Sequence, residues 1–96
     1  DMIDTGGTIV KAAQALKAAG AHRVIVAATH AIFSDPASDR LQDSSIDEVV
    51  ITDTIPLTES RRWDKLTILP IAPLLARAIH EVFEDGSVTS MFGGDA

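Results

Sequence analysis

The sequence predicts an α/β domain with a mainly parallel sheet flanked by helices. Apolar residues at helical spacing alternate along the chain with short, continuous apolar runs, a pattern typical of parallel strands joined by helices. The chain has 96 residues, of which 46% are hydrophobic, which is enough for one modest core. We find no internal repeat and no low-complexity segment, so residues 1–96 are treated as one domain.

The first third of the chain predicts a strand, a helix and a second strand. Residues 1–4 are the expected end of a strand. Apolar positions recur every three to four residues over 7–19, which predicts a helix that stops at Gly20. Residues 24–28 form a continuous apolar run, the pattern of a strand buried on both faces.

The middle third predicts a short helix and a short strand. Ser34 and Pro36 are typical of an N-cap and a first turn, and the helix is expected over 36–42. The apolar run 49–51 predicts the next strand. A polar connection over 55–64 follows.

The last third predicts a strand over 65–69 and a helix that begins at Pro70 and ends before Gly86. Six apolar residues at helical spacing form its expected buried stripe: Ile71, Leu74, Leu75, Ala78, Ile79 and Val82. Residues 87–92 are expected to form a terminal strand or an ordered tail. Residues 93–96 are expected to be frayed.

The most informative motif is residues 1–8, DMIDTGGT. Gly6 and Gly7 have no side chains to prevent a phosphate from approaching the backbone, and the following helix supplies free N–H groups. Thr5 and Thr8 add hydroxyl donors. The alternative is a tight strand-to-helix turn in which the glycines serve geometry alone.

Two carboxylates, Asp1 and Asp4, favour the binding interpretation of this motif. An acid beside a phosphate repels it unless a sugar or a cation lies between them. Carboxylates can accept hydrogen bonds from ribose hydroxyls or bind Mg²⁺. The motif therefore predicts a sugar-phosphate site.

Two further segments are expected to lie near this motif. Residues 29–34 and 52–54 each follow a predicted strand, as do residues 1–8. The carboxyl ends of parallel strands meet at one edge of a sheet, where ligands bind. We therefore expect all three segments along one edge.

Charge and composition narrow the classes of partner. The net charge is −6, which argues against a nucleic-acid partner, because such a protein needs a basic face. The chain has no cysteines, which excludes thiolate metal sites. No apolar stretch approaches the roughly 20 residues of a spanning helix, and no secretory signal is recognisable. We therefore expect a cytoplasmic location and no membrane partner.

Residues 1–8 resemble the phosphoribosyl-pyrophosphate signature of type I phosphoribosyltransferase-fold proteins. Three further segments, 28–34, 49–56 and 87–92, resemble ribose-phosphate pyrophosphokinase, the family also called phosphoribosyl pyrophosphate synthetase. The four segments occur in the family's order and cover essentially the whole chain. The resemblance implies a Rossmann-like, type I phosphoribosyltransferase-like fold that is truncated at its N-terminus. It also implies that the chain is the C-terminal domain of a longer, two-domain protein.

The resemblance implies a reaction and a role for each matched residue. The family transfers pyrophosphate from ATP to ribose 5-phosphate, with Mg²⁺ as cofactor, giving phosphoribosyl pyrophosphate and AMP. Five residues would cradle the 5-phosphate: Asp4, Thr5, Gly6, Gly7 and Thr8. Asp1 matches the second of two adjacent acids that contact the ribose and the magnesium-bound substrate.

The family's catalytic and ATP-binding residues would lie upstream, so none is assigned here and the isolated chain is expected to be inactive. Its metal ligands also cannot be assigned. Ser87, Val88 and Thr89 match a segment that binds regulatory phosphate or ADP, and the family forms homo-oligomers, commonly hexamers. Asp35 stands where many members have Gly, which leaves the turn after Ser34 open.

Two alternatives remain. The chain could belong to a base-transferring phosphoribosyltransferase, or to a non-catalytic regulatory homologue that only binds the phosphoribosyl group.

Four residues outside the motif are expected to have structural roles rather than to bind a ligand. His30 is expected to be a hydrogen-bonding structural residue rather than a ligand. Arg61 and Arg62 are expected to be a solvated loop pair, and Trp63 to anchor that loop against the core.

Overall fold

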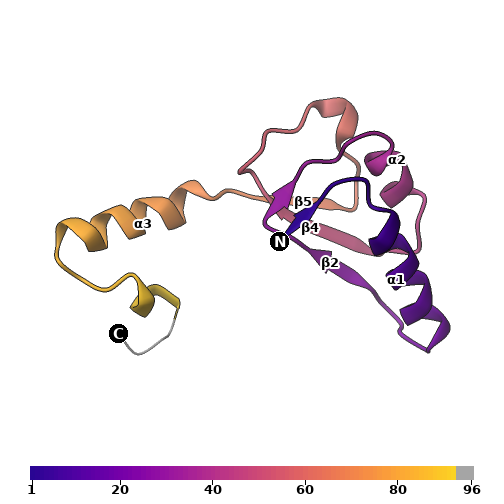
Figure 1. The fold of residues 1–96 in the computed structure, drawn as a ribbon, viewed down its shortest axis with the longest axis horizontal. Helices are drawn as coiled ribbons and strands as arrows, with labels where there is room; N and C mark the ends of the chain where they lie inside the picture. Colours follow the sequence, from indigo (N-terminus) through magenta and orange to yellow (C-terminus); the bar gives the residue numbers. More distant parts are fainter. Residues whose placement is uncertain (93–96) are drawn as a thin grey trace.

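The structure is a computed structural model that describes residues 1–92 (Figure 1). The frayed end expected over 93–96 lies outside the described residues. The elements in chain order are β1 (Met2–Ile3), α1 (Gly7–Ala18), β2 (Ile25–Ala27), β3 (His30–Ala31), α2 (Ala37–Gln42), β4 (Glu48–Thr52), the 3₁₀ turn η1 (Glu59–Arg61), β5 (Leu66–Leu69), α3 (Ala72–Phe83) and the 3₁₀ turn η2 (Thr89–Phe92). None of the helices over 1–92 has the length and apolar character needed to cross a membrane.

The strands confirm the predicted parallel α/β fold. β4 lies between β2 and β5, and β1 pairs with β3; every one of these pairings is parallel. Only Ala28 and Thr29 separate β2 from β3, so the chain of β2 continues directly into the partner of β1. The strands thus form a two-stranded sheet of β1 and β3 and a three-stranded sheet in the order β2, β4, β5, and the two are joined where β2 leads into β3. They are together called the sheet below.

The core lies between one face of this sheet and the first two helices. Val49 and Ile51 of β4 are only 1% exposed, and they belong to the same buried cluster as Ala13 of α1 and Leu41 of α2. Phe33 lies in the same cluster and is fully buried. Alternation along β4 explains this burial, because successive strand residues point to opposite faces.

The opposite face of the sheet is uncovered in the described part of the chain, so the prediction that residues 24–28 are buried on both faces is wrong. Ile25 is 53% exposed and Ala27 is also exposed, whereas Val24 is buried. Ala27 pairs with Val50 of β4, so the two side chains lie on the same, uncovered face of the sheet. The apolar run was a correct sign of a strand, but no described helix covers its second face.

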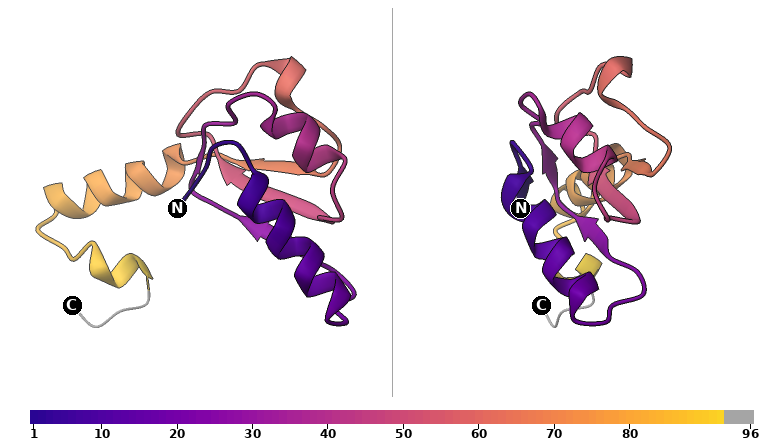
Figure 2. Two further views of the ribbon diagram at one scale, coloured as in Figure 1. Left: turned by 45° about the vertical axis from the view of Figure 1, so that its right-hand side comes forward. Right: turned by 90° about the vertical axis from the view of Figure 1, so that its right-hand side faces the viewer.

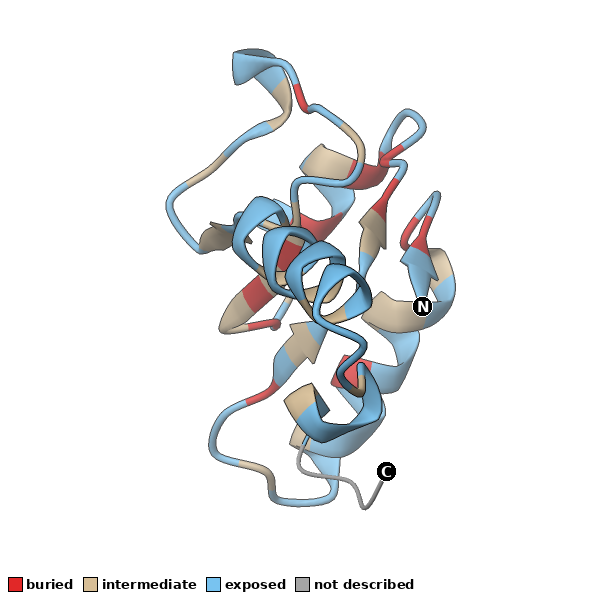
Figure 3. Cartoon of the chain, turned by 90° about the vertical axis from the view of Figure 1, so that its left-hand side faces the viewer, coloured by how far each residue is buried: buried red, intermediate tan, exposed pale blue. Residues whose placement is uncertain are grey.

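The last helix corrects a second prediction, because its apolar stripe is not buried. α3 extends away from the sheet (Figure 2), and Figure 3 shows it mostly in the colour of exposed residues. Leu75 is 55% exposed, and Ile79 and Val82 are exposed further. The radius of gyration is 16.4 Å, whereas a compact domain of this length has about 12 to 13 Å.

Two helix starts also differ from the prediction. The Ser34 side chain does not cap α2; instead its backbone carbonyl accepts a hydrogen bond from the Ala37 N–H at 2.8 Å, and the helix begins at Ala37. α3 begins at Ala72, two residues after Pro70, and the Asp53 carboxylate accepts a hydrogen bond from the N–H of Ile71 at 2.9 Å.

Candidate functional site

The turn between β1 and α1 has the geometry that the sequence motif predicts. Gly6 has φ of 80°, in the left-handed region that favours glycine, and its carbonyl accepts the N–H of Val10 at 3.0 Å. No side chain among residues 1–92 caps this end of α1. The N–H groups of the first turn, residues 7–9, therefore remain available to an anion.

Each glycine is required for a different reason. A Cβ on Gly6 would lie 3.3 Å from Cγ of Leu41, in addition to the strain of its positive φ. Gly7 has no positive φ, but a Cβ there would lie 3.0 Å from Nη1 of Arg40. The turn is therefore packed closely against α2, which supplies both neighbours.

The carboxylates of the motif are open to solvent. Asp1 and Asp4 are both exposed, and neither forms an ion pair with a described residue. Asp4 lines a hollow of about 340 Å³ together with residues 5–8 of the turn. Within residues 1–92, no three His, Asp or Glu side chains gather as a metal-binding group.

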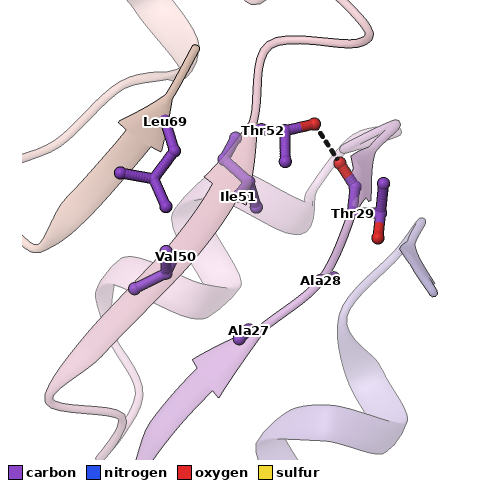
Figure 4. A pocket seen from close by; sticks show the side chains of 7 residues that line it. All are labelled: Ala27, Ala28, Thr29, Val50, Ile51, Thr52 and Leu69. Atoms are coloured by element: carbon purple, nitrogen blue, oxygen red, sulfur yellow. Dashed lines mark hydrogen bonds between the residues drawn. The ribbon is translucent and has the colours of Figure 1, made fainter. Parts of the chain in front are cut away.

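The structure brings together the three segments that were expected at one edge. The N–H of His30 donates to the Asp1 carbonyl at 2.9 Å, which joins residues 29–34 to the motif. The Thr52 hydroxyl donates to the Thr29 carbonyl at 2.6 Å (Figure 4), and His30 Nδ1 lies 2.7 Å from the Thr54 hydroxyl. Residues 52–54 therefore contact the motif's neighbour rather than the motif itself.

A second hollow lies at the carboxyl ends of β2, β4 and β5. It has a volume of about 290 Å³, and its walls are mostly apolar (Figure 4). It is lined by Ala27, Ala28, Thr29, Val50, Ile51, Thr52 and Leu69. With two threonines as its only polar side chains, it offers no charged group to a phosphate.

The segment expected to bind a regulatory anion lies apart from the motif. Ser87, Val88 and Thr89 follow α3, which extends away from the sheet (Figure 1). The Ser90 hydroxyl donates to the Ser87 carbonyl at 2.7 Å, and the Met91 N–H donates to the Val88 carbonyl at 3.1 Å. These residues form a hydrogen-bonded turn, and their binding role stays a prediction.

The residues outside the motif give mixed outcomes. His30 is a hydrogen-bonding residue, as predicted. The prediction of a solvated pair at Arg61 and Arg62 is confirmed for Arg62, which is exposed, whereas Arg61 is partly buried. The Arg61 guanidinium donates to the Phe33 carbonyl and lies 3.4 Å from the Asp35 carboxylate, while Arg62 donates to the Leu57 carbonyl. Both therefore hold the connection over 55–64 in place.

Trp63 packs against the core as expected, because its ring centroid lies 5.9 Å from that of buried Phe33. The residue that sequence reasoning missed is Arg40. Its Nη1 donates to the Thr5 carbonyl at 3.1 Å, inside the candidate loop. A basic residue on a short predicted helix gives no sequence signal of such a contact.

Comparison with known proteins finds a family that matches nearly the whole chain. Residues 1–93 match the family model described as the phosphoribosyl synthetase-associated domain. The ribose-phosphate pyrophosphokinase of Corynebacterium efficiens is 58% identical over 96 residues, covering 100% of this chain and 29% of that protein. That of Streptomyces coelicolor is 60% identical over 92 residues, covering 96% of this chain and 28% of that protein.

The fold is also found in a solved structure. The crystal structure of phosphoribosylpyrophosphate synthetase from Mycobacterium smegmatis matches with a TM-score of 0.83 and 55% identity, covering 90% of this chain and 29% of that one. The chain thus spans less than a third of the length of these relatives.

Proposed function

Because the chain belongs to the phosphoribosyl synthetase-associated domain family, we propose that it forms the ribose 5-phosphate-binding part of a ribose-phosphate pyrophosphokinase. In the proposed reaction the C1 hydroxyl of ribose 5-phosphate attacks the β-phosphorus of ATP. The bond between the β-phosphorus and the oxygen that bridges it to the α-phosphorus breaks, AMP leaves with that oxygen, and the proton of the attacking hydroxyl is released. The products are phosphoribosyl pyrophosphate and AMP.

The observation that carries this proposal is the uncapped start of α1 beside two carboxylates. Gly6 turns the chain so that the N–H groups of residues 7–9 point out of the helix end, where the helix dipole favours an anion. A 5-phosphate at this position leaves the ribose within the hollow that Asp4 lines. Thr5 and Thr8 add hydroxyl donors at the same turn.

Mg²⁺ is the proposed cofactor, and the donor set fits it. Asp1 and Asp4 are exposed carboxylates, and Mg²⁺ is usually bound through one or two carboxylates together with substrate phosphates and waters. When bound, the ion would neutralise charge on the phosphates.

The residues of this chain would act mainly by positioning. Phosphoryl transfer asks little covalent chemistry of the protein and depends on orientation and charge neutralisation. The loop would fix the acceptor sugar, while ATP would be held largely by residues outside the chain. We therefore propose that this is the C-terminal domain of the whole enzyme and that it is inactive alone.

Further parts of the proposal concern assembly and regulation. The exposed apolar stripe of α3 supports a covering partner, and we propose a homo-oligomer, commonly a hexamer in this family. Ser87, Val88 and Thr89 are the proposed binding segment for regulatory phosphate or ADP. A cytoplasmic location is proposed from the family.

The test is an assay of the whole enzyme for AMP formation from ATP, with ribose 5-phosphate as acceptor. Thr8→Ala should raise the KM for ribose 5-phosphate by about ten- to a hundredfold, the loss of roughly one hydrogen bond to a charged group. Thr67→Ala is the matched control, because Thr67 lies on β5. An unchanged KM in Thr8→Ala would contradict the loop assignment.

Two companion measurements on the whole enzyme, of base exchange and of ribose 5-phosphate binding, distinguish the alternative functions. Exchange of a purine or pyrimidine base with phosphoribosyl pyrophosphate, without AMP formation, would identify a base-transferring enzyme. Binding of ribose 5-phosphate with neither reaction would identify a regulatory homologue.

A further inference from the structure

We propose that Arg40 is a positioning residue for the phosphate loop, defined here as residues 4–8. In this inference, which rests on the proposed function, Arg40 holds the Thr5 carbonyl and so fixes the direction in which the loop presents its N–H groups.

The contact involves two points of the loop at once. Nη1 of Arg40 donates to the Thr5 carbonyl at 3.1 Å. The same atom lies 3.0 Å from where a Cβ on Gly7 would be, so the guanidinium lies against the backbone of both residues. Thr5 lies just before Gly6, the left-handed turn, and Gly7 just after it. Arg40 therefore contacts both sides of the bend.

α2 is well anchored for this task. Ala37 and Leu41 are at most 1% exposed, and the Ser38 hydroxyl donates to the Arg61 carbonyl at 3.0 Å. Leu41, the next residue along the helix, packs against Gly6. The helix thus supports the loop through an apolar contact and a polar contact from adjacent residues.

The hydrogen bond from Arg40 also reduces electrostatic repulsion between the Thr5 carbonyl oxygen and a bound phosphate. A carbonyl oxygen turned toward a bound phosphate would repel it, whereas the Thr5 oxygen is occupied by a cation. No carboxylate among residues 1–92 forms an ion pair with Arg40, so its positive charge remains available near the anion.

Gly7 provides a way to test the contact without removing Arg40. Because Gly7 has no positive φ, alanine can adopt its backbone conformation, and the obstacle is Nη1 of Arg40. The methyl group introduced by Gly7→Ala is therefore expected to displace the guanidinium from the Thr5 carbonyl. Gly7→Ala and Arg40→Met should then remove the same interaction.

The experiment measures steady-state kinetics and ribose 5-phosphate affinity of the whole enzyme that carries this chain. Arg40→Met should raise the KM and the Kd for ribose 5-phosphate by about five- to tenfold, with the KM for ATP little changed. Gly7→Ala should give a similar rise, and the double variant should be no worse than either single variant. Arg77→Met on α3 is the control for loss of one exposed cation.

The Arg40→Lys variant distinguishes positioning of the loop by the guanidinium from a simple effect of positive charge. If Arg40 acts only through its charge, lysine will restore the wild-type KM, and the proposal is wrong. If the guanidinium positions the loop, lysine will restore the affinity only in part, since its ammonium lacks the rigid planar fork. Equal melting temperatures of Arg40→Met and wild type would show that the KM change is not a loss of folding.

The possible failures are distinguishable. A wild-type enzyme that neither forms AMP nor binds ribose 5-phosphate would overturn the proposed function, and this inference with it. An active wild type whose Arg40→Met variant keeps its KM would overturn only the role of Arg40. A Gly7→Ala variant that keeps the wild-type KM for ribose 5-phosphate would also contradict it, because the displaced guanidinium should have weakened the affinity.

Discussion

Nζ of Lys17 lies 2.8 Å from Oδ2 of Asp47, at the opposite end of α1 from the candidate loop. The same carboxylate oxygen accepts the N–H of Val24 at 2.7 Å, and Lys17 also donates to the His22 carbonyl. Asp47 therefore ties the end of α1 to the starts of β2 and β4.

This pair predicts an acid-sensitive contribution to stability. The Lys17 hydrogen bond, followed by that of the Val24 N–H, lowers the pKa of the Asp47 carboxyl. A carboxyl with a lowered folded-state pKa stabilises the fold above its unfolded-state pKa, and this stabilisation is lost as the pH falls. Asp47→Asn should be less stable than wild type at pH 7, and the difference should shrink below about pH 4. Urea unfolding at both pH values measures it. An equal difference at both values would contradict the assignment.

The buried contact below the loop predicts a large loss of stability. Leu41 is 1% exposed and packs against Gly6, so Leu41→Ala should cost about 2–5 kcal/mol. Leu75 is 55% exposed on α3 within this chain, so Leu75→Ala should cost under about 1 kcal/mol where no partner covers the helix, and more in the proposed homo-oligomer. Urea unfolding of the whole enzyme checks both variants. A cost for Leu75→Ala that approaches the cost for Leu41→Ala would support a covered stripe.

Gly6 and Gly20 both have a left-handed backbone conformation, but their replacement by alanine should differ in its effect on stability and on ribose 5-phosphate binding. Gly6→Ala and Gly20→Ala both place a side chain at positive φ, which costs about 1–2 kcal/mol. Only Gly6 also has a neighbour, Leu41, at 3.3 Å from the new Cβ. Gly6→Ala should therefore be the more destabilising variant and should weaken ribose 5-phosphate binding. Gly20→Ala should leave that affinity unchanged, as isothermal titration can measure.

The proposed Mg²⁺ role predicts that Asp4 and the ion act together. Asp4→Asn should raise the Kd for ribose 5-phosphate by about tenfold in the presence of Mg²⁺, through loss of a charged contact. The effect should shrink after EDTA removes the ion. Asp64→Asn makes the same charge change at an exposed position outside the loop and serves as the control. An undiminished effect in EDTA would indicate direct contact with the sugar alone.

Most of the fold followed from local sequence patterns. The helix expected over 7–19 lies at Gly7–Ala18, and the strands expected over 49–51 and 65–69 lie at Glu48–Thr52 and Leu66–Leu69. The spacing of apolar residues predicts such elements well because it shows which face of a helix or strand is apolar and avoids water. It cannot say what covers that face, which is why the stripe of α3 and the second face of β2 were predicted to be buried.

The candidate site was predictable only where its residues are adjacent in sequence. The motif, residues 1–8, is contiguous and its turn was expected. The contacts that shape the turn were not, because Arg40 and Thr5 are separated by 35 positions and no local pattern joins them. His30 and Thr54 are separated by 24 positions. The side chain of Ser34 was predicted to cap α2, whereas the hydrogen bond to the Ala37 N–H is accepted by the Ser34 backbone carbonyl, which no residue type specifies.

The contact between Arg40 and Thr5 also bears on the order in which the chain folds. Closing a loop of 35 residues costs entropy that only long-range packing can offset, while α1 can form from local hydrogen bonds. We therefore expect the phosphate loop to reach its native shape late, after α2 has packed against the sheet. A ligand that recognises this loop distinguishes a finished domain from a partly folded one, and its binding stabilises the finished state alone.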